Sequence, residues 1–319
     1  MKGRRVIKVG FAKTAFEVVL DRKVTILKGQ SGTGKTTFVE LIDEKLKKSR
    51  NSSIISLSSN APLIVLKEGD DWKKVLMSNK GCIIISDEGN EVIETVEFAG
   101  YVKESDNYFL FVSRSGMLTN LTYSVYSVIE FKSEKKGNVY LTKSFQRYFE
   151  TYEKKKPSIL YTEDKGTGCE MMRLVATGFL VESANGKDNL IKIVTDRYKR
   201  GLLNGTCLLV DGAAFGGNIG AFNRFLPYIM IIAPESFEYL LLKTRLLYRF
   251  VKNEVDNTAD YCEYSSNILT YENFYYYLLR EVMRTRLKVA YTKSKLPNIL
   301  KSEDVLSDIK ALLPQIDFS

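Results

Sequence analysis

The sequence predicts an α/β protein of two domains, and three patterns support this fold class. Residues 23–46 read as a short apolar strand, a glycine-rich loop and an amphipathic helix in direct succession. Further continuous apolar runs end in polar or acidic residues, as buried parallel strands do at the carboxyl edge of a sheet. Residues 153–157, a charged run that ends in proline, interrupt the periodicity. In a chain of 319 residues we therefore expect domains over residues 1–152 and 158–319.

The glycine-rich loop, GQSGTGKT at residues 29–36, has the spacing G-x-x-x-x-G-K-T. Its glycines reach backbone conformations in which successive N–H groups converge on phosphate oxygens, and the following helix aims its positive end at the same place. The segment resembles the phosphate-binding loop of P-loop nucleoside triphosphatases. The resemblance implies that Lys35 reaches the β- and γ-phosphates of ATP and that the Thr36 hydroxyl binds Mg²⁺. The residues expected to contact the nucleotide are Gly29, Gln30, Ser31, Gly32, Thr33, Gly34, Lys35, Thr36 and Thr37.

A second apolar run, CIIIS at residues 82–86, leads directly into Asp87 and Glu88. A buried parallel strand of this kind delivers both carboxylates to the sheet edge where the ligand of the loop would lie. The run resembles a Walker B element, which implies that Asp87 holds Mg²⁺ through water and that Glu88 positions the attacking water. We therefore expect ATP and Mg²⁺ as cofactors and ATP hydrolysis as the reaction.

Arg114 follows another apolar run, YFLFV at residues 108–112. The tip of a neighbouring strand is a position from which ATPases sense the γ-phosphate. An arginine there either takes this catalytic role or pairs with Glu88 or Asp87. The sequence leaves both roles open.

Antiparallel hairpins are expected on either side of these strands. Apolar residues over 5–9 and 16–20 predict one hairpin ahead of the loop strand, and those over 123–131 and 139–145 predict another. The remaining elements expected in the first domain are a strand over 53–57 and an Asp-capped helix over 70–77.

The composition narrows the chemistry that is open to the chain. There is no histidine, which excludes His-based acid–base catalysis, Ser-His-Asp or Cys-His nucleophiles and His-bound metals. Lys and Arg number 47 against 38 Asp and Glu, a surplus compatible with nucleic acid, with the nucleotide or simply with solubility. Four isolated cysteines indicate reduced thiols. Because no apolar run is long enough for a membrane span, we expect a cytoplasmic protein without a membrane partner.

In the second domain, three apolar runs each bring a carboxylate to the end of an expected strand. The runs are residues 177–182, 206–211 and 228–233, and the acids are Glu182, Asp211 and Glu238. Strand ends in a parallel sheet share one edge, and gathered carboxylates raise one another's pKa unless a cation lies among them. We therefore expect an α/β domain in which these three acids are candidate ligands of a second Mg²⁺ or Mn²⁺.

The order of these motifs carries a second resemblance. A strand ending in Glu182, a strand ending in Asp211 and the spacing P-x-x-x-E that ends at Glu238 resemble the TOPRIM domain of topoisomerases, primases and ATPase-linked nucleases. The resemblance implies that Glu182 acts as general base or acid and that Asp211 and Glu238 serve the metal. Ala213 stands where the family has a further acid. An ATPase joined to such a domain also resembles proteins of phages, mobile elements and their defence systems.

The chain becomes helical from Tyr239 onward, and tyrosines and basic residues are interleaved over residues 274–288. Such a stretch either lines a nucleic-acid groove or is the solvated face of a helix. Two hypotheses follow for the whole chain. It is either an ATPase coupled to a domain that binds or cleaves DNA or RNA, or a nucleotide-dependent switch whose degenerate second domain binds a protein partner or another copy of itself.

Overall fold

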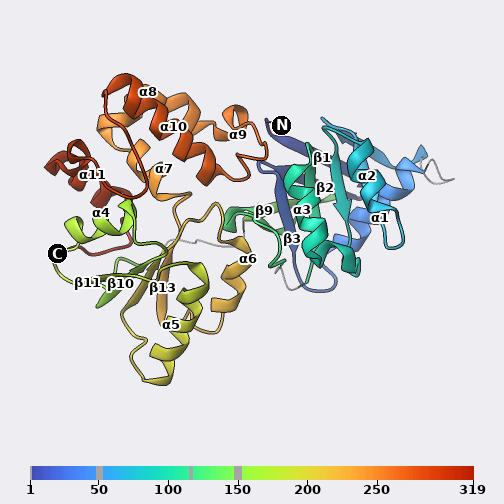
Figure 1. Ribbon diagram of the computed structural model, residues 1–319. Helices are drawn as coiled ribbons and strands as arrows, with labels where there is room; N and C mark the ends of the chain where they lie inside the picture. The colour runs from blue at the N-terminus through green and yellow to red at the C-terminus, as the bar shows by residue number, and fades with distance from the viewer. Residues whose placement is uncertain (1, 48–52, 115–117, 147–152) are drawn as a thin grey trace. The chain divides into compact units, whose positions relative to one another are not determined.

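The computed structural model describes residues 2–47, 53–114, 118–146 and 153–319 and shows a mixed α/β protein (Figure 1). The chain divides into two compact units: residues 1–148 with 259–270 form unit 1, and residues 149–258 with 271–319 form unit 2. Residues 147–152, where the first domain was expected to end, lie outside the described part. No sequence pattern indicated that residues 259–270 return to unit 1.

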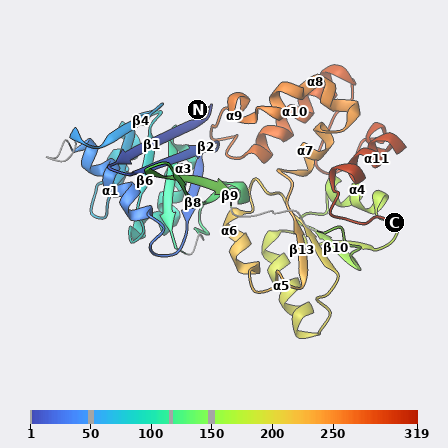
Figure 2. The same ribbon diagram turned by 180° about the vertical axis from the view of Figure 1, so that it is seen from behind.

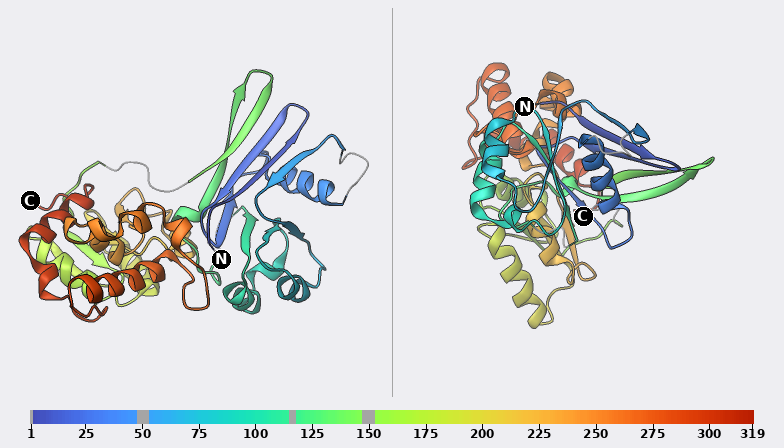
Figure 3. Two further views of the ribbon diagram at one scale, coloured as in Figure 1. Left: turned by 90° about the horizontal axis from the view of Figure 1, so that it is seen from above. Right: turned by 90° about the vertical axis from the view of Figure 1, so that its right-hand side faces the viewer.

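Unit 1 is organised around a nine-stranded sheet. Its strands are β1 (Arg5–Phe11), β2 (Thr14–Leu20), β3 (Val24–Lys28), β4 (Ser56–Ser59), β5 (Leu63–Leu66), β6 (Ile83–Ser86), β7 (Tyr108–Ser113), β8 (Val128–Lys136) and β9 (Val139–Gln146). They are ordered β4-β1-β2-β9-β8-β3-β7-β6-β5. Strands β5, β6, β7, β3 and β8 are parallel, whereas β1–β2 and β8–β9 are the two antiparallel hairpins. The left-hand view of Figure 3 shows these hairpins side by side, joined by the pairing of β2 with β9.

Helices and the β1–β2 hairpin cover both faces of the parallel strands. The helices of this unit are α1 (Lys35–Leu46), α2 (Trp72–Ser78), η2 (Glu91–Glu94), α3 (Val96–Glu104) and η3 (Val125–Ser127), with α9 (Thr258–Tyr261) at the change of unit. Asp71 caps α2 by accepting a hydrogen bond from the Lys74 backbone N–H, as the predicted Asp-capped helix requires. The expected strand at residues 53–57 begins three residues later, and β4 lies at the edge of the sheet, antiparallel to β1.

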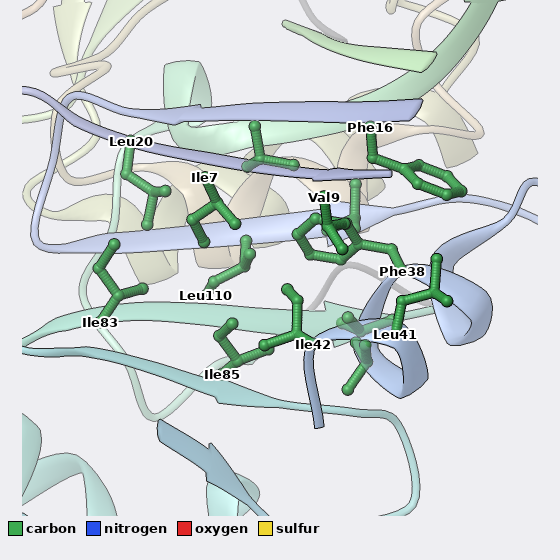
Figure 4. Close-up of a cluster of buried hydrophobic side chains, with 14 of the residues drawn as sticks. Ile7, Val9, Phe16, Leu20, Phe38, Leu41, Ile42, Ile83, Ile85 and Leu110 are labelled. Atoms are coloured by element: carbon green, nitrogen blue, oxygen red, sulfur yellow. The ribbon is translucent and has the colours of Figure 1, made fainter. Parts of the chain in front are cut away.

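Alternate residues of the central strands enter two separate hydrophobic clusters. Ile83 and Ile85 of β6 pack with α1 and the β1–β2 hairpin, whereas Ile84 between them packs with α2 and α3. Figure 4 shows the first cluster, in which side chains from β1 and β2 meet those from β6, β7 and α1. Because both faces of β6 are buried, its sequence reads as a continuous apolar run. The same burial fixes the register that places Asp87 and Glu88 at the end of this strand.

Lys23, just before β3, is buried in unit 1 with 4 % of its surface exposed. Its Nζ donates a hydrogen bond to the Lys103 carbonyl at 2.8 Å. Burial lowers the pKa of Lys23 to about 8, although Asp106 and Glu104 oppose the shift. The folded protein therefore releases this proton at a pH where the unfolded chain still holds it.

We predict that Lys23 makes the folded protein more stable as pH rises from about 8 to 10. Below pH 8 Lys23 is charged in the folded and in the unfolded protein, so the burial of this charge lowers the free energy of unfolding by its full amount. Above pH 8 only the unfolded state carries it, so the cost fades. Relative to Lys23→Met, the unfolding free energy of the wild type should rise by about 1–3 kcal/mol over this interval. Urea denaturation of both proteins measures it, and a constant difference would show that Lys23 keeps its proton when folded.

Unit 2 contains a four-stranded parallel sheet. Its strands are β10 (Ile159–Thr162), β11 (Leu180–Ser183), β12 (Thr206–Leu209) and β13 (Ile229–Ile232), ordered β11-β10-β12-β13. The crossover helices α4 (Thr167–Val175) and α5 (Lys187–Lys199) lie on opposite sides of this sheet, as Figure 2 shows. The direction of progression reverses between β10 and β12, which opens a crevice at the carboxyl ends of these two strands.

The α/β class of this unit, with helices at its end, is confirmed. The remaining helices are α6 (Gly216–Ile219), η4 (Gly220–Phe222), α7 (Phe237–Leu242), α8 (Arg245–Asp256), α10 (Tyr271–Arg286), η5 (Asn298–Lys301) and α11 (Glu303–Leu312). None of the helices in the described ranges is both long enough and apolar enough for a transmembrane segment.

Candidate functional site

The glycine-rich segment forms the turn between β3 and α1 in unit 1. Gln30, Ser31 and Gly32 are exposed at its tip, and Thr36 and Thr37 are exposed on the first turn of α1. Gly34, which precedes α1, has a φ of 89°, and a Cβ there would lie 3.0 Å from the Phe16 ring. A side chain at this position would strain the backbone and push on the core, so glycine is required for the turn.

Lys35 is the buried member of the segment, with 5 % of its surface exposed. Its Nζ donates hydrogen bonds to the carbonyls of Gly29 at 2.6 Å and Gln30 at 2.8 Å, and to Thr33 Oγ1 at 3.3 Å. The Lys35 ammonium group is therefore held by oxygen atoms of the same segment. The same Nζ, released from these carbonyls, is available to an anion that enters the turn.

Asp87 and Glu88 follow β6, which is separated from β3 by the single strand β7. Burial raises the pKa of Asp87, and the adjacent Glu88 adds to the rise, whereas the Glu88 N–H and the charge of Lys35 oppose it. The Lys35 charge thus acts on Asp87 across the edge of the sheet. A divalent cation beside Asp87 would favour the ionised carboxylate in the same way.

Arg114, at the end of β7, pairs with Glu88. Both its Nε and its Nη2 lie 2.8 Å from Glu88 Oε1. Of the two roles predicted for Arg114, the structure shows this pairing, while sensing of a phosphate is untested. The arginine side chain is largely exposed, so the pair contributes little to stability and can separate readily.

An open cavity of about 570 Å³ adjoins this pair and is lined by residues that include Glu88, Asn90 and Arg114. Asn90 is buried and donates from Nδ2 to Ser86 Oγ at 3.1 Å. Within the described residues, Glu88 Oε2 and Asn90 Oδ1 are buried without a hydrogen-bond partner. Two unsatisfied acceptors beside an open cavity are suited to binding a water molecule.

A second polar site lies in unit 2, at the crevice between the carboxyl ends of β10 and β12. Glu163 follows β10, and its Oε2 accepts a hydrogen bond of 3.4 Å from the backbone N–H of Asp211. Asp211 follows β12 by two residues, and its Oδ1 accepts from the Phe237 backbone N–H at 3.0 Å. These bonds hold both carboxyl groups at a small cavity of about 30 Å³.

Three further residues complete this site. We call the five residues Glu163, Asp211, Glu238, Glu272 and Lys293 the acid cluster. Lys293 Nζ lies 2.8 Å from Glu272 Oε1 and 3.9 Å from Glu238 Oε1. Glu238 is 2 % exposed and accepts a hydrogen bond from the Tyr291 hydroxyl at 3.2 Å.

The backbone of Lys293 is fixed against the turn that follows β10. The Lys293 carbonyl accepts a hydrogen bond from the Thr167 N–H at 3.0 Å. A Cβ at Gly166 would lie 2.3 Å from this carbonyl oxygen. Gly166 is therefore needed for the close approach that sets Lys293 beside the acids.

The acid cluster carries more negative charge than its surroundings solvate well. Burial raises the pKa of Glu163, Asp211 and Glu238, and the neighbouring carboxylates, Glu272 foremost, raise the pKa of Asp211 further. Burial alone would lower the pKa of Lys293, but Glu238 and Glu272 outweigh it and raise that pKa. Added positive charge would relieve the remaining repulsion.

Glu182 does not join Asp211 and Glu238, contrary to the expected grouping. It lies within β11, the edge strand, rather than past a strand end, and it is exposed. Burial raises the pKa of Tyr161, and the Glu182 carboxylate adds to this rise. The Arg197 guanidinium lies over the same ring. Since side chains alternate across a sheet, a residue inside a strand is directed to a face and not to the carboxyl edge.

Glu163 takes the place that was predicted for Glu182, and the sequence analysis missed it. The signal was present: the run ILYT at residues 159–162 is followed by Glu163 and Asp164, just as IIIS at 83–86 is followed by two acids. The run lies directly after the proline-ended stretch, at the start of the expected second domain, and was not recognised as a strand. Glu272 and Lys293 had no such signal, because the helical region places them by tertiary packing alone.

Comparisons of the chain with protein-family models, with curated proteins and with solved structures gave no match. The two candidate sites therefore stand on their own geometry, within an α/β protein.

Proposed function

We propose that unit 1 binds ATP with Mg²⁺ and hydrolyses it. The observation that carries this proposal is the arrangement of three charged groups at one sheet edge: Lys35 after β3, and Asp87 and Glu88 after β6. A strand, a glycine-rich turn and a helix form a ready anion site. Carboxylates one strand further along are suited to a hydrated divalent cation and to a water molecule.

In this proposal each residue has a separate task. Lys35 leaves the carbonyls of Gly29 and Gln30 and binds the β- and γ-phosphates. Thr36 and Asp87 hold Mg²⁺, which when bound neutralises phosphate charge. Glu88 accepts a hydrogen bond from the attacking water, once Arg114 has released its Oε1.

Lys35→Ala tests the nucleotide site. We expect ATP affinity to fall by about tenfold or more, because one charge-assisted contact to phosphate is lost. Lys47→Ala, at the far end of α1, removes the same charge and should leave the affinity unchanged. Fluorescent ATP analogue titration gives both values. Equal affinities in wild type and Lys35→Ala would mean that the turn binds no phosphate.

A second activity is favoured by the acid cluster: divalent-metal-dependent hydrolysis of phosphodiester bonds in DNA or RNA. Carboxylate oxygens are the donors that Mg²⁺ and Mn²⁺ prefer, and three of these carboxyl groups have a raised pKa that a cation would relieve. In the described parts of the chain no three acids are close enough to hold an ion together. Binding would have to draw Glu163 and Asp211 toward the ion, and Lys293 would have to leave Glu272 to face a substrate phosphate.

The alternative is a nucleotide-dependent switch whose second unit binds a protein or another copy of the chain. Ala213, buried two residues past Asp211, offers no further carboxylate and favours this alternative. The two are separated by incubating the protein with nucleic acids and Mn²⁺, and by sizing it with and without ATP. Cleavage supports the first, and ATP-dependent association without cleavage supports the second.

A further inference from the structure

A strongly basic stretch of the chain begins within α10 and reaches the acid cluster. Residues 276–301 contain seven Lys and Arg residues and one acid, Glu281. The local excess is therefore six positive charges, in a chain whose net charge is +9. Positive charge concentrated in one segment is an electrostatic footprint for a polyanion.

The exposed side of α10 arranges part of this charge in one row. Tyr277, Arg280 and Arg284 are spaced three and four residues apart and are all exposed, and the exposed Lys288 lies two residues past the end of the helix, where the backbone turns. Residues at this spacing share one helix face. We call Tyr277, Arg280, Arg284 and Lys288 the α10 strip.

Tyr276 joins the strip to the acid cluster. The Arg280 guanidinium lies 5.4 Å from the centre of its ring, and Lys293 Nζ also lies 5.4 Å from that centre. Lys293 in turn contacts Glu272 and Glu238. Cation and aromatic groups therefore continue without a break from the acid cluster to the exposed face of α10, all within unit 2.

We propose that the α10 strip binds single-stranded nucleic acid and leads its backbone to the acid cluster. Arg280, Arg284 and Lys288 would contact phosphates, while the ring of Tyr277, 42 % exposed, offers a face on which an unpaired base stacks. A duplex needs no such face, since its bases are already stacked. The inference rests on the proposed phosphodiester chemistry of the acid cluster for its purpose, but the binding itself requires neither metal nor ATP.

Glu281 gives the strip an internal counter-charge. Arg284 Nη2 donates to both of its carboxylate oxygens, at 2.9 and 3.0 Å. A phosphate that binds Arg284 must compete with this carboxylate. Removing the charge of Glu281 should therefore strengthen binding, which few structural disturbances would do.

Fluorescence anisotropy with a labelled oligothymidylate or oligouridylate, in EDTA and without nucleotide, tests the proposal on the full chain. We expect Arg280→Ala to weaken binding by about tenfold and to lower the salt slope by about 0.7, the share of one phosphate contact on a single strand. Glu281→Gln should tighten binding by about two- to fivefold, the worth of an exposed ion pair. Arg200→Ala is the matched control, because it removes another exposed arginine at the end of a helix in unit 2, one that pairs with the exposed Asp196. It should leave the binding of the oligonucleotide unchanged.

Each other outcome has one meaning. Equal binding by Arg280→Ala and Arg200→Ala overturns the strip, as does equal competition by duplex or by polyglutamate, which would show a general polyanion or protein surface. Strip-dependent binding without any cleavage in Mn²⁺ keeps this inference and removes the hydrolytic proposal. If the protein cleaves nucleic acid in Mn²⁺ but Arg280→Ala does not change binding, the hydrolytic proposal is kept and this inference is wrong.

Discussion

Glu88→Gln should lower the rate of ATP hydrolysis by at least about a hundredfold while ATP still binds. The amide keeps the size of the side chain and can still accept a hydrogen bond from Arg114, but it cannot take a proton from water. Lys35 and the glycine-rich turn are untouched, so nucleotide affinity should stay within a few-fold of the wild type. Single-turnover hydrolysis of labelled ATP, beside an equilibrium binding titration, separates the two quantities.

Glu91→Gln is the matched control for this variant. Glu91 lies three residues further along and lines the same cavity, but it is exposed. Its loss should change the hydrolysis rate by less than about twofold, because an exposed charge at this distance is screened. If Glu88→Gln hydrolyses ATP at the wild-type rate, the water is activated elsewhere, and the Arg114–Glu88 contact is an ordinary surface ion pair.

The contrast between the two sites shows what a sequence pattern can place. Gly29 to Thr36, Asp87 and Glu88 are placed by local order alone, because a strand that is buried on both faces must end where its apolar run ends. The sequence therefore predicted both strands and the acids that follow β6. It did not predict that β7 lies between β3 and β6, since strand order depends on long-range pairing.

In unit 2 the same reasoning placed Asp211 correctly past the end of its strand, but it chose Glu182 and not Glu163 as the carboxylate beside it. Glu182 and Glu163 both sit near the end of an apolar run, and only the strand order shows that β10 pairs directly with β12. Glu272 lies in the first turn of α10 and Lys293 in the loop after this helix, more than 50 residues past Asp211. Their approach depends on how the last helices pack on the sheet, which amphipathic periodicity does not determine.

The acid cluster also makes a prediction in which stability and activity move in opposite directions. Asp211→Asn should abolish metal-dependent cleavage, with a loss of at least about a hundredfold, because a ligand worth several kcal/mol to the transition state is removed. In metal-free protein the same change should raise the melting temperature of unit 2. Asn keeps an oxygen for the Phe237 N–H but carries no charge among Glu163, Glu238 and Glu272.

The sign follows from the raised pKa of Asp211. The folded state binds this proton more tightly than the unfolded state, so stability falls as pH rises from about 4 through the folded pKa. The gain from Asp211→Asn should accordingly be largest above neutral pH and vanish toward pH 4. Each kcal/mol gained corresponds to about 2–4 °C for a unit of this size. Thermal unfolding at several pH values in EDTA measures it.

Adding Mn²⁺ reverses the order of the two proteins. Wild type should gain up to about 3 kcal/mol when the ion exceeds its dissociation constant a hundredfold, whereas Asp211→Asn should gain little. Glu182→Gln, an equivalent loss of charge on the exposed edge strand, should behave as wild type in cleavage and in both unfolding series. If Glu182→Gln loses the metal response and Asp211→Asn keeps it, the ion is held at β11 and not at the crevice between β10 and β12. A metal response in wild type and in Glu182→Gln but not in Asp211→Asn, even without cleavage, would identify the acid cluster as a cation site whose repulsion destabilises the metal-free protein.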